Sequence, residues 1–320
     1  MSTSVPAAAA EVRGRAPQPP PPGRRRPRAS DRTRKERNLG WMLAGPAFVL
    51  MVGVTGYPVL NAVWLSLFDY RLTDPGARSF VGLGNYATIL TDGLFWRQLG
   101  VTTAITVVTV AVEFVLGFAL ALVMHRALVL RRALRTAILV PYGIVTVISA
   151  YAWQYAFTPA QGFVNPLFGL GGFDWFGETV PALVVVCLSE IWKTTPFMSL
   201  LLLAGLAQIP GDYLEAAEVD GATAWQRFRK VVVPNMKAAI MVALLFRTLD
   251  AFRIFDSVFV MTQGAQGTET LSFLAYRQTI SRVMIGLGSA VSVILAVLVV
   301  LIAVLFIKGF KTDLSQQRGS

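Results

Sequence analysis

The chain alternates long apolar runs with short polar passages. About 20 helical residues cross the hydrocarbon core of a bilayer, and six apolar runs reach that length: about 40–66, 98–124, 136–157, 181–206, 238–260 and 284–307. Within lipid every backbone polar group must be satisfied inside the protein, so runs of this length form helices. The pattern therefore predicts an all-α, polytopic membrane protein with six transmembrane helices.

The composition supports a membrane protein. Of the 320 residues, 54% are hydrophobic and only 15% are charged, which is too apolar for a soluble domain of this length. In a soluble chain the net charge of +11 would suggest a nucleic-acid partner. Here the Lys and Arg residues lie mainly in the amino-terminal tail and in short loops, where they orient the membrane helices. We therefore expect contact with membrane lipid and no nucleic acid.

Three segments follow from the pattern. Residues 1–38 are rich in Pro, Arg and Ala without apolar periodicity, which predicts a disordered basic tail. A signal peptide is not expected there, because the following apolar run is too long and lacks a small-residue cleavage site. Residues 39–311 are predicted to form the transmembrane domain, and residues 312–320 a second short tail.

The basic residues also predict an orientation. With the amino terminus inside, the segments 1–39, 125–135, 207–237 and 308–320 are cytoplasmic and carry 21 Lys or Arg, whereas the three outer segments carry five. Basic residues concentrate on the cytoplasmic side of membrane proteins. We therefore expect a multi-pass protein of the inner or plasma membrane with both termini in the cytoplasm.

The polar stretch 210–234 lies between the fourth and fifth apolar runs and is expected in the cytoplasm. Asp212 with Glu215 three residues later has the spacing of a capping box, which predicts a short helix from Tyr213. Gly221 supplies the turn that ends this helix. Taken alone, the pattern fits either an amphipathic hairpin that joins two spans or a docking element for a partner.

A second short helix is expected after this glycine. Trp225 and Phe228, three residues apart, share one of its faces, and Pro234 marks the start of the next apolar run.

These residues match a known pattern. Glu215-Ala216-Ala217, Gly221 and Val231-x-Val233-Pro234 have the spacing EAA-x3-G-x9-V-x-V-P, which resembles the EAA loop of permease subunits of bacterial ATP-binding-cassette (ABC) importers. That family has Ile and Leu where this chain has two Val, and these changes keep the positions apolar. By resemblance the loop docks in a groove of an ATPase subunit. The residues expected at this contact are Glu215, Ala216, Ala217, Asp220, Gly221, Trp225 and Pro234.

The resemblance extends from about Asn38 to Lys311. Residues 80–86, FVGLGNY, resemble an external F-x-G-L-x-N-Y element, and Pro141-Tyr142 with Trp153 resemble the ends of the family's third span. Residues 262–266, TQGAQ, depart from the family pattern T-x-G-G-P, so the resemblance does not define this turn. It implies the type I importer permease fold of maltose-type sugar permeases.

By the same resemblance the chain works with four kinds of partner. These are a second related permease, an ATPase dimer, an external substrate-binding lipoprotein and a sugar, for which trehalose or a related disaccharide is expected. Transport is expected to proceed by alternating access.

No catalytic constellation is evident in the sequence. A Walker A phosphate loop is missing, and so are a nucleophile elbow and an H-E-x-x-H motif. The single cysteine, Cys187, and the single histidine, His125, cannot form a metal cluster. We therefore expect no enzyme activity, no catalytic residue, no metal and no cofactor in this chain; ATP and Mg²⁺ would be bound by the partner ATPases.

Ionisable residues within the apolar runs mark a candidate substrate pathway, because such residues are costly in lipid and face a cavity or one another. The candidates are Glu190, Trp192 and Lys193 in the fourth run and Asp250, Arg253 and Asp256 in the fifth. With Arg247, the charges of the fifth run recur every three residues, which predicts one polar stripe on a single helix.

Two interpretations of these charges stay open from sequence alone. They either bind sugar hydroxyls in a water-lined pathway, with neighbouring aromatics on the sugar face, or form interhelical ion pairs. Glu113 in the second run is expected to pair with a charge on the fourth or fifth. An ion- or proton-coupled carrier is the alternative function, but such carriers usually contain internal repeats, none of which is evident here.

Overall fold

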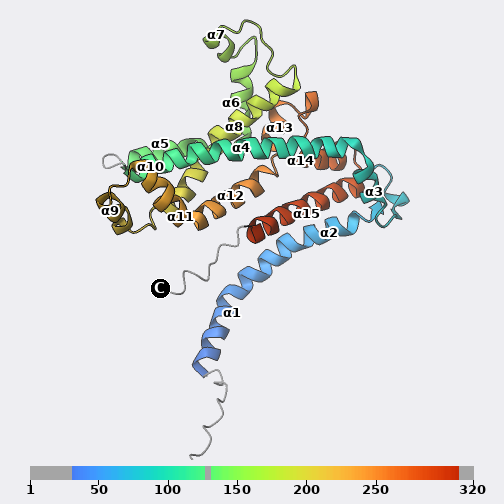
Figure 1. Ribbon diagram of the computed structural model, residues 1–320. Coiled ribbons are helices and arrows are strands. Elements are labelled where there is room, and N and C mark those ends of the chain that lie inside the picture. Colours follow the sequence, from blue (N-terminus) through green and yellow to red (C-terminus); the bar gives the residue numbers. More distant parts are fainter. Residues whose placement is uncertain (1–30, 127–130, 310–320) are drawn as a thin grey trace, which may run out of the picture. The chain divides into compact units, whose positions relative to one another are not determined.

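The computed structural model describes residues 31–126 and 131–309, and this part of the chain is mainly helical (Figure 1). The chain divides into a first unit that ends at Tyr57 and a second that begins at Pro58. The two units are described separately.

The first unit contains helix α1 (Asp31–Met51) and the π-helical turn η1 (Val52–Gly56). The boundary predicted at residue 38 falls inside α1, since the basic stretch that begins at Asp31 is helical. The remainder of the predicted amino-terminal tail and the predicted tail 312–320 lie outside the described residues. Trp41 and Met42 of α1 are exposed, as expected of apolar side chains that face lipid or protein.

The second unit contains all remaining elements. In chain order they are α2 (Tyr57–Leu65), which starts at the division, β1 (Phe68–Asp69), η2 (Pro75–Ala77), β2 (Ser79–Phe80), α3 (Gly84–Thr91), α4 (Gly93–Arg126), α5 (Arg131–Gly143), α6 (Thr146–Phe157), α7 (Val164–Phe168), α8 (Thr179–Leu206), α9 (Gly211–Val219), α10 (Ala224–Arg227), η3 (Phe228–Val232), α11 (Val233–Asn235), α12 (Lys237–Ala251), α13 (Asp256–Met261), η4 (Ala265–Gly267), α14 (Leu271–Tyr276), η5 (Arg277–Ser281) and α15 (Ile285–Gly309).

Fewer helices than predicted could each span a membrane. Four described helical runs are long and apolar enough: Asn38–Leu65, Gly93–His125, Thr179–Leu206 and Ile285–Gly309. The third predicted span is a pair of helices, α5 and α6, bent by 90°. Counting this pair as one span gives five, so the six-helix count is not reproduced as six continuous helices in the described part of the chain.

The bend in the third span has a local cause. Pro141 lies inside α5, and a proline lacks the amide hydrogen that continues a helix. Val145 then adopts an extended conformation, with φ −58° and ψ 132°, immediately before α6. These two backbone features redirect the chain between Gly143 and Thr146.

The fifth predicted span is broken as well. It consists of α12, with 15 residues, and α13, with six. Between them the amides of Arg253 and Ile254 donate to the carbonyls of Asp250 and Ala251 in tight three-residue turns. The prediction of one polar stripe on one helix is therefore wrong, because the helix axis ends before the stripe does.

The longest helices, α4 and α8, pack against each other in the core of the second unit (Figure 1). A Cβ at Gly117 of α4 would lie 2.8 Å from the Met198 side chain of α8, so glycine is needed for this close approach. Three apolar clusters fill the spaces around this pair. One joins α6, α8 and α13, the second joins α4, α8 and α12, and the third joins α14 and α15 with the start of α4.

A small β-hairpin, formed by β1 and β2, and the helix α3 that follows it lie at one end of the unit. β1 and β2 pair antiparallel with Phe68 opposite Phe80. Asn85, in the predicted external element, donates from Nδ2 to the carbonyls of Ser66 at 2.8 Å and Phe68 at 2.9 Å. Tyr86 shares a 2.6 Å hydrogen bond with the Ser66 hydroxyl. This element therefore fastens the loop to the end of α2.

The turn 262–266, which the family pattern does not define, is compact. Gln263, Gly264 and Gln266 have φ between 53° and 71°. The Thr268 hydroxyl donates to Oγ1 of Thr262 at 2.7 Å. The turn thereby returns the chain from α13 to α14.

Candidate functional site

Two regions of the second unit carry the predicted functional residues. The first, which we call the hairpin, extends from Gly211 to Asn235 and contains α9, α10, η3 and α11. The second is a polar pocket between α5, α6, α8, α12 and α13.

The start of α9 corrects the predicted capping box. The helix begins at Gly211, two residues before the predicted start, and its cap residue is Pro210, with φ −59° and ψ 135°. No side chain caps this end. The Asp212 carboxylate lies within the first turn instead, where its negative charge interacts favourably with the helix dipole. A capping box does occur at α10, where Thr223 and Gln226 each bond the other's backbone amide.

The end of α9 confirms the helix-ending turn predicted at Gly221. This glycine has φ +76° and its amide donates to Glu218 O, while the Ala222 amide donates to Ala217 O, both at 3.0 Å. These two bonds form a Schellman motif, which requires a left-handed residue at this position. An added Cβ at Gly221 would meet nothing within 4 Å, so the requirement comes from backbone conformation alone.

An aromatic pair, Trp225 of α10 and Phe228 of η3, anchors the hairpin to α4. Trp225 and Phe228 stack with their ring centroids 5.5 Å apart, as the spacing predicts. Phe228 also contacts Phe118 of α4 edge-on at 5.2 Å. Trp225 is 66% exposed. One ring of the pair therefore holds the hairpin in place, and the other lies on the surface.

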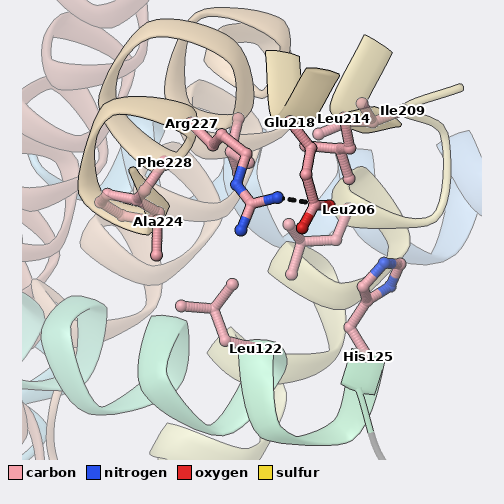
Figure 2. A pocket seen from close by; sticks show the side chains of 10 residues that line it. Leu122, His125, Leu206, Ile209, Leu214, Glu218, Ala224, Arg227 and Phe228 are labelled. Carbon is pink, nitrogen blue, oxygen red and sulfur yellow. Dashed lines mark ion pairs between the residues drawn. The ribbon is translucent and has the colours of Figure 1, made fainter. Parts of the chain in front are cut away.

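Behind the hairpin is a mainly apolar cavity of about 420 Å³. Figure 2 shows Glu218 of α9 paired with Arg227 of α10, with Leu122 and His125 of α4 on the facing side. The ion pair measures 2.6 Å between Arg227 Nη1 and Glu218 Oε2. This ion pair links two short helices at the edge of the cavity. Its main effect is therefore to hold α9 and α10 in a fixed relative orientation.

The predicted contact residues lie largely on the surface. Glu215, Ala216, Asp220 and Pro234 are exposed, and Ala217 is half-buried. None of the residues of α9 or α10 is buried. Two further exposed side chains, Tyr213 and the 88% exposed Val219, had no place in the prediction. The sequence did contain a sign of them, because both are large apolar residues on a short helix that is otherwise mostly polar or small.

The polar pocket brings together most of the predicted pathway residues. It has a volume of about 430 Å³. Its lining includes five of the six predicted residues, which are Glu190, Lys193, Asp250, Arg253 and Asp256. Trp192 lies elsewhere, in an apolar hollow with Pro141 and Pro196.

Several pocket residues had not been predicted. Thr146, Thr194 and Ser257 add hydroxyl groups, and Tyr142 adds an aromatic ring beside Phe255, which is one of the aromatics expected next to the charges of the fifth run. Tyr142 stacks on Phe197 with ring centroids 5.4 Å apart. Lys193 Nζ lies 5.9 Å from the centroid of the Tyr142 ring. Tyr142 comes from α5 and enters the pocket only because the third span is bent, which hydropathy alone does not predict.

A buried ion cluster lies directly behind the pocket. The Arg247 guanidinium donates from Nε and Nη2 to the two oxygens of Glu113, the latter bond measuring 2.9 Å. Its Nη1 donates to Asp250 Oδ2 at 2.9 Å, and Nη2 lies 3.5 Å from Glu190 Oε2. Arg247 is 1% exposed and Glu113 is fully buried. The prediction that Glu113 pairs with a charge on the fourth or fifth run is confirmed.

The neighbouring helices complete the cluster. Glu113 Oε1 also accepts a hydrogen bond of 2.8 Å from the Thr194 hydroxyl, and Glu190 accepts one from the Ser257 hydroxyl. Helices α4, α8, α12 and α13 are therefore joined through charged groups. Among the described residues no group of three or more His, Cys, Asp and Glu has the arrangement of a metal site.

Known proteins resemble most of this chain. A family model described as "binding-protein-dependent transport system inner membrane component" matches residues 113–312, which include the hairpin and the polar pocket. The chain is 54% identical over 275 residues to the trehalose transport system permease protein SugA of Mycobacterium tuberculosis, covering 86% of this chain and 89% of the relative.

A second relative and a solved structure extend the comparison. The trehalose/maltose transport system permease protein MalF of Thermococcus litoralis is 36% identical over 279 residues, covering 86% of this chain and 94% of that protein. A chain of a bacterial ABC transporter involved in the import of alginate has the same fold, with a TM-score of 0.74 at 21% identity over 88% of this chain and 98% of that one. The chain belongs to the family of binding-protein-dependent transport system inner membrane components.

Proposed function

We propose that this chain is the permease subunit of an ATP-driven importer and that its cargo is trehalose or a related disaccharide. The observation that carries the proposal is the composition of the polar pocket. Carboxylates, cations and hydroxyls line it together with two aromatic rings. Sugars offer many hydroxyl groups, which pair with such charged partners, and apolar ring faces, which pack on aromatic side chains.

The size of the pocket agrees with a small carbohydrate. Its volume of about 430 Å³ falls within the range of roughly 300–1,000 Å³ typical of small-molecule sites. Two relatives carry trehalose in their names, which favours a disaccharide over a longer polymer. An ion-coupled carrier is not favoured, because the family match points to transport driven through partner subunits.

The hairpin is proposed as the contact with an ATPase subunit. Tyr213, Val219 and Trp225 give it exposed apolar side chains, and Glu215 and Asp220 supply charge at the same surface. A short helix with this mixture suits docking in a groove. In this proposal the hairpin lies in the cytoplasm, and a second permease, an ATPase dimer and an external binding lipoprotein complete the importer.

The fifth span in this proposal is discontinuous. Helices α12 and α13 together cross the membrane, and residues 253–255 of the break between them line the pocket. Irregular backbone is tolerated at membrane depth where it lines a polar cavity. Alternating access then requires the two short helices to move as rigid parts around this break.

The test is trehalose uptake into proteoliposomes that contain the chain, its partner permease, the ATPase and the binding protein. Asp250→Asn and Arg253→Gln should each reduce uptake strongly while the complex still assembles. Asp69→Asn, at an exposed carboxylate outside the pocket, is the matched control and should transport normally. Normal uptake by both pocket variants would contradict the proposed pathway.

A further inference from the structure

The buried Glu113 does not line the polar pocket, yet it accepts two of the hydrogen bonds that Arg247 donates. Two of the three guanidinium nitrogens, Nε and Nη2, donate to Glu113, and Nη1 alone donates to Asp250. Glu113 itself does not line the pocket. Any effect it has on a ligand must therefore pass through Arg247.

We propose that Glu113 is a positioning residue for sugar binding, which acts by restricting Arg247 to a single bond with Asp250. This inference rests on the proposed sugar pocket and goes beyond it, because it assigns a role to a residue outside the pocket lining. Its consequence is specific: Asp250 keeps one carboxylate oxygen for a sugar hydroxyl.

The charges around Arg247 explain why such a restriction is needed. Three carboxylates, those of Glu113, Glu190 and Asp250, lie within ion-pair distance of one guanidinium group. A guanidinium group binds a carboxylate most strongly through two parallel bonds. Without Glu113, Arg247 could form such a two-bond pair with Asp250 and withdraw both of its oxygens from the pocket.

The exposure of the two acidic partners fits this division of roles. The Asp250 side chain is 64% exposed, whereas Arg247 is 1% exposed and Glu113 is fully buried. In the described structure Asp250 accepts a side-chain hydrogen bond through Oδ2. Its position in the pocket lining leaves Oδ1 for a ligand. Glu190 is held similarly, since Ser257 donates to its Oε1 and Arg247 lies near its Oε2.

The experiment measures sugar affinity at the pocket directly. A reporter cysteine at Thr146, which lines the pocket, is introduced in a Cys187→Ala background of the assembled importer. Trehalose is added in increasing concentration, and protection of the cysteine from a maleimide gives the half-protecting concentration. This value does not depend on the transport rate, and a purely structural residue should leave it unchanged.

The test variant is Glu113→Asp, which keeps the charge and shortens the side chain by one methylene. The shorter carboxylate cannot keep both bonds to Arg247, so Asp250 becomes occupied. The half-protecting concentration should rise at least about tenfold, since a hydrogen bond to a charged group contributes more than one decade of affinity. Glu269→Asp, in another buried carboxylate–arginine pair, is the matched control and should leave it unchanged.

A second variant covers the case in which Glu113→Asp does not assemble. Glu113→Gln combined with Arg247→Met removes both buried charges, which proteins often tolerate better than the loss of one partner. This double variant should assemble and keep protection near the parental value, because no guanidinium group remains to occupy both oxygens of Asp250. Unchanged protection in assembled Glu113→Asp, or lost protection in the double variant, with Asp250→Asn clearly weakened, would overturn the positioning role. Unchanged protection in Asp250→Asn as well would remove the sugar pocket itself, and with it this inference.

Discussion

The hairpin and the buried cluster contain the same kind of ion pair in opposite surroundings. Arg227 and Glu218 approach to 2.6 Å with side chains 25% and 70% exposed. Arg247 and Glu113 form two bonds with side chains 1% and 0% exposed. An exposed pair contributes about 0–1 kcal/mol, whereas removing one partner of a buried pair costs about 3–5 kcal/mol. Burial, not bond length, separates the two regions.

This difference indicates what each region can do. The cluster fixes the relative positions of four helices, so changes there should affect assembly first. The hairpin has no buried residue in α9 or α10, so changes there should leave the fold intact and alter contacts with a partner. The predictions below test this separation, from the largest expected effect to the smallest.

The largest effect is expected for Arg247→Gln. This change leaves the Glu113 carboxylate buried without its cation, at a cost of about 3–5 kcal/mol. The yield of assembled complex and the midpoint of thermal unfolding in detergent should both fall sharply. Arg253→Gln, on the exposed side of the same segment, is the matched control and should assemble normally. Equal assembly of the two variants would mean that the cluster adds little to stability.

A smaller effect is expected for Gly221→Val. A side chain at a residue with φ +76° costs roughly 1–2 kcal/mol, and a β-branched residue is especially unfavourable there. The permease should insert normally but retain less ATPase and transport less sugar per ATP. Gly221→Asn is the control, because Asn tolerates the left-handed conformation. Identical coupling in both variants would exclude a role for the Schellman turn.

These two predictions show what could be read from the sequence. The hairpin was predictable because its glycine, its aromatic spacing and its polar composition are local signals. Its first helix was predicted two residues too late, since Pro210 rather than Asp212 forms the cap. Hydropathy also located each apolar run, but it could not show that the third is bent and the fifth is broken, because the hydropathy of a run does not report the backbone conformation at single residues.

The polar pocket shows more clearly what local sequence patterns could not predict. The charges of Asp250, Arg253 and Asp256 were predicted from a helical spacing of three, although the helix ends before Asp256. They still meet in one pocket, because the break bends the chain around it. The contributions of Tyr142 and Ser257 depend on the bend and the break, so no local pattern could have found them.

A pH effect is expected from the other buried pair. Burial raises the pKa of the Glu269 carboxyl, while Arg277 and a hydrogen bond from Gln98 oppose the shift. In the described structure Oε1 of Glu269 and Oε1 of Gln98 are both buried without a partner. A proton on Glu269 could join these two oxygens, since the Gln98 amide already donates to Oε2 of Glu269.

The raised pKa of Glu269 determines whether stability rises or falls with pH. A folded-state pKa above the unfolded value means that Glu269 stabilises the fold at acidic pH and loses this contribution as pH rises through the folded value. Thermal unfolding midpoints measured from pH 4.5 to 8.5 should therefore fall more steeply in the parent than in Glu269→Gln. Glu178→Gln, at an exposed carboxylate, should keep the parental slope. A slope unchanged by Glu269→Gln would assign the pH dependence to other groups.

The smallest effect is expected at the exposed ion pair of the hairpin, and it tests the comparison most sensitively. A double-mutant cycle with Glu218→Gln and Arg227→Gln should give a coupling energy below about 1 kcal/mol for unfolding of the isolated permease. Salt should reduce it further, because exposed charges are screened. The same cycle, measured for ATPase retention in the assembled complex, should give a larger coupling if docking covers the hairpin and lowers the exposure of both groups. Equal coupling in the two measurements would mean that the pair stays in water in the complex, and that the ATPase contacts the hairpin elsewhere.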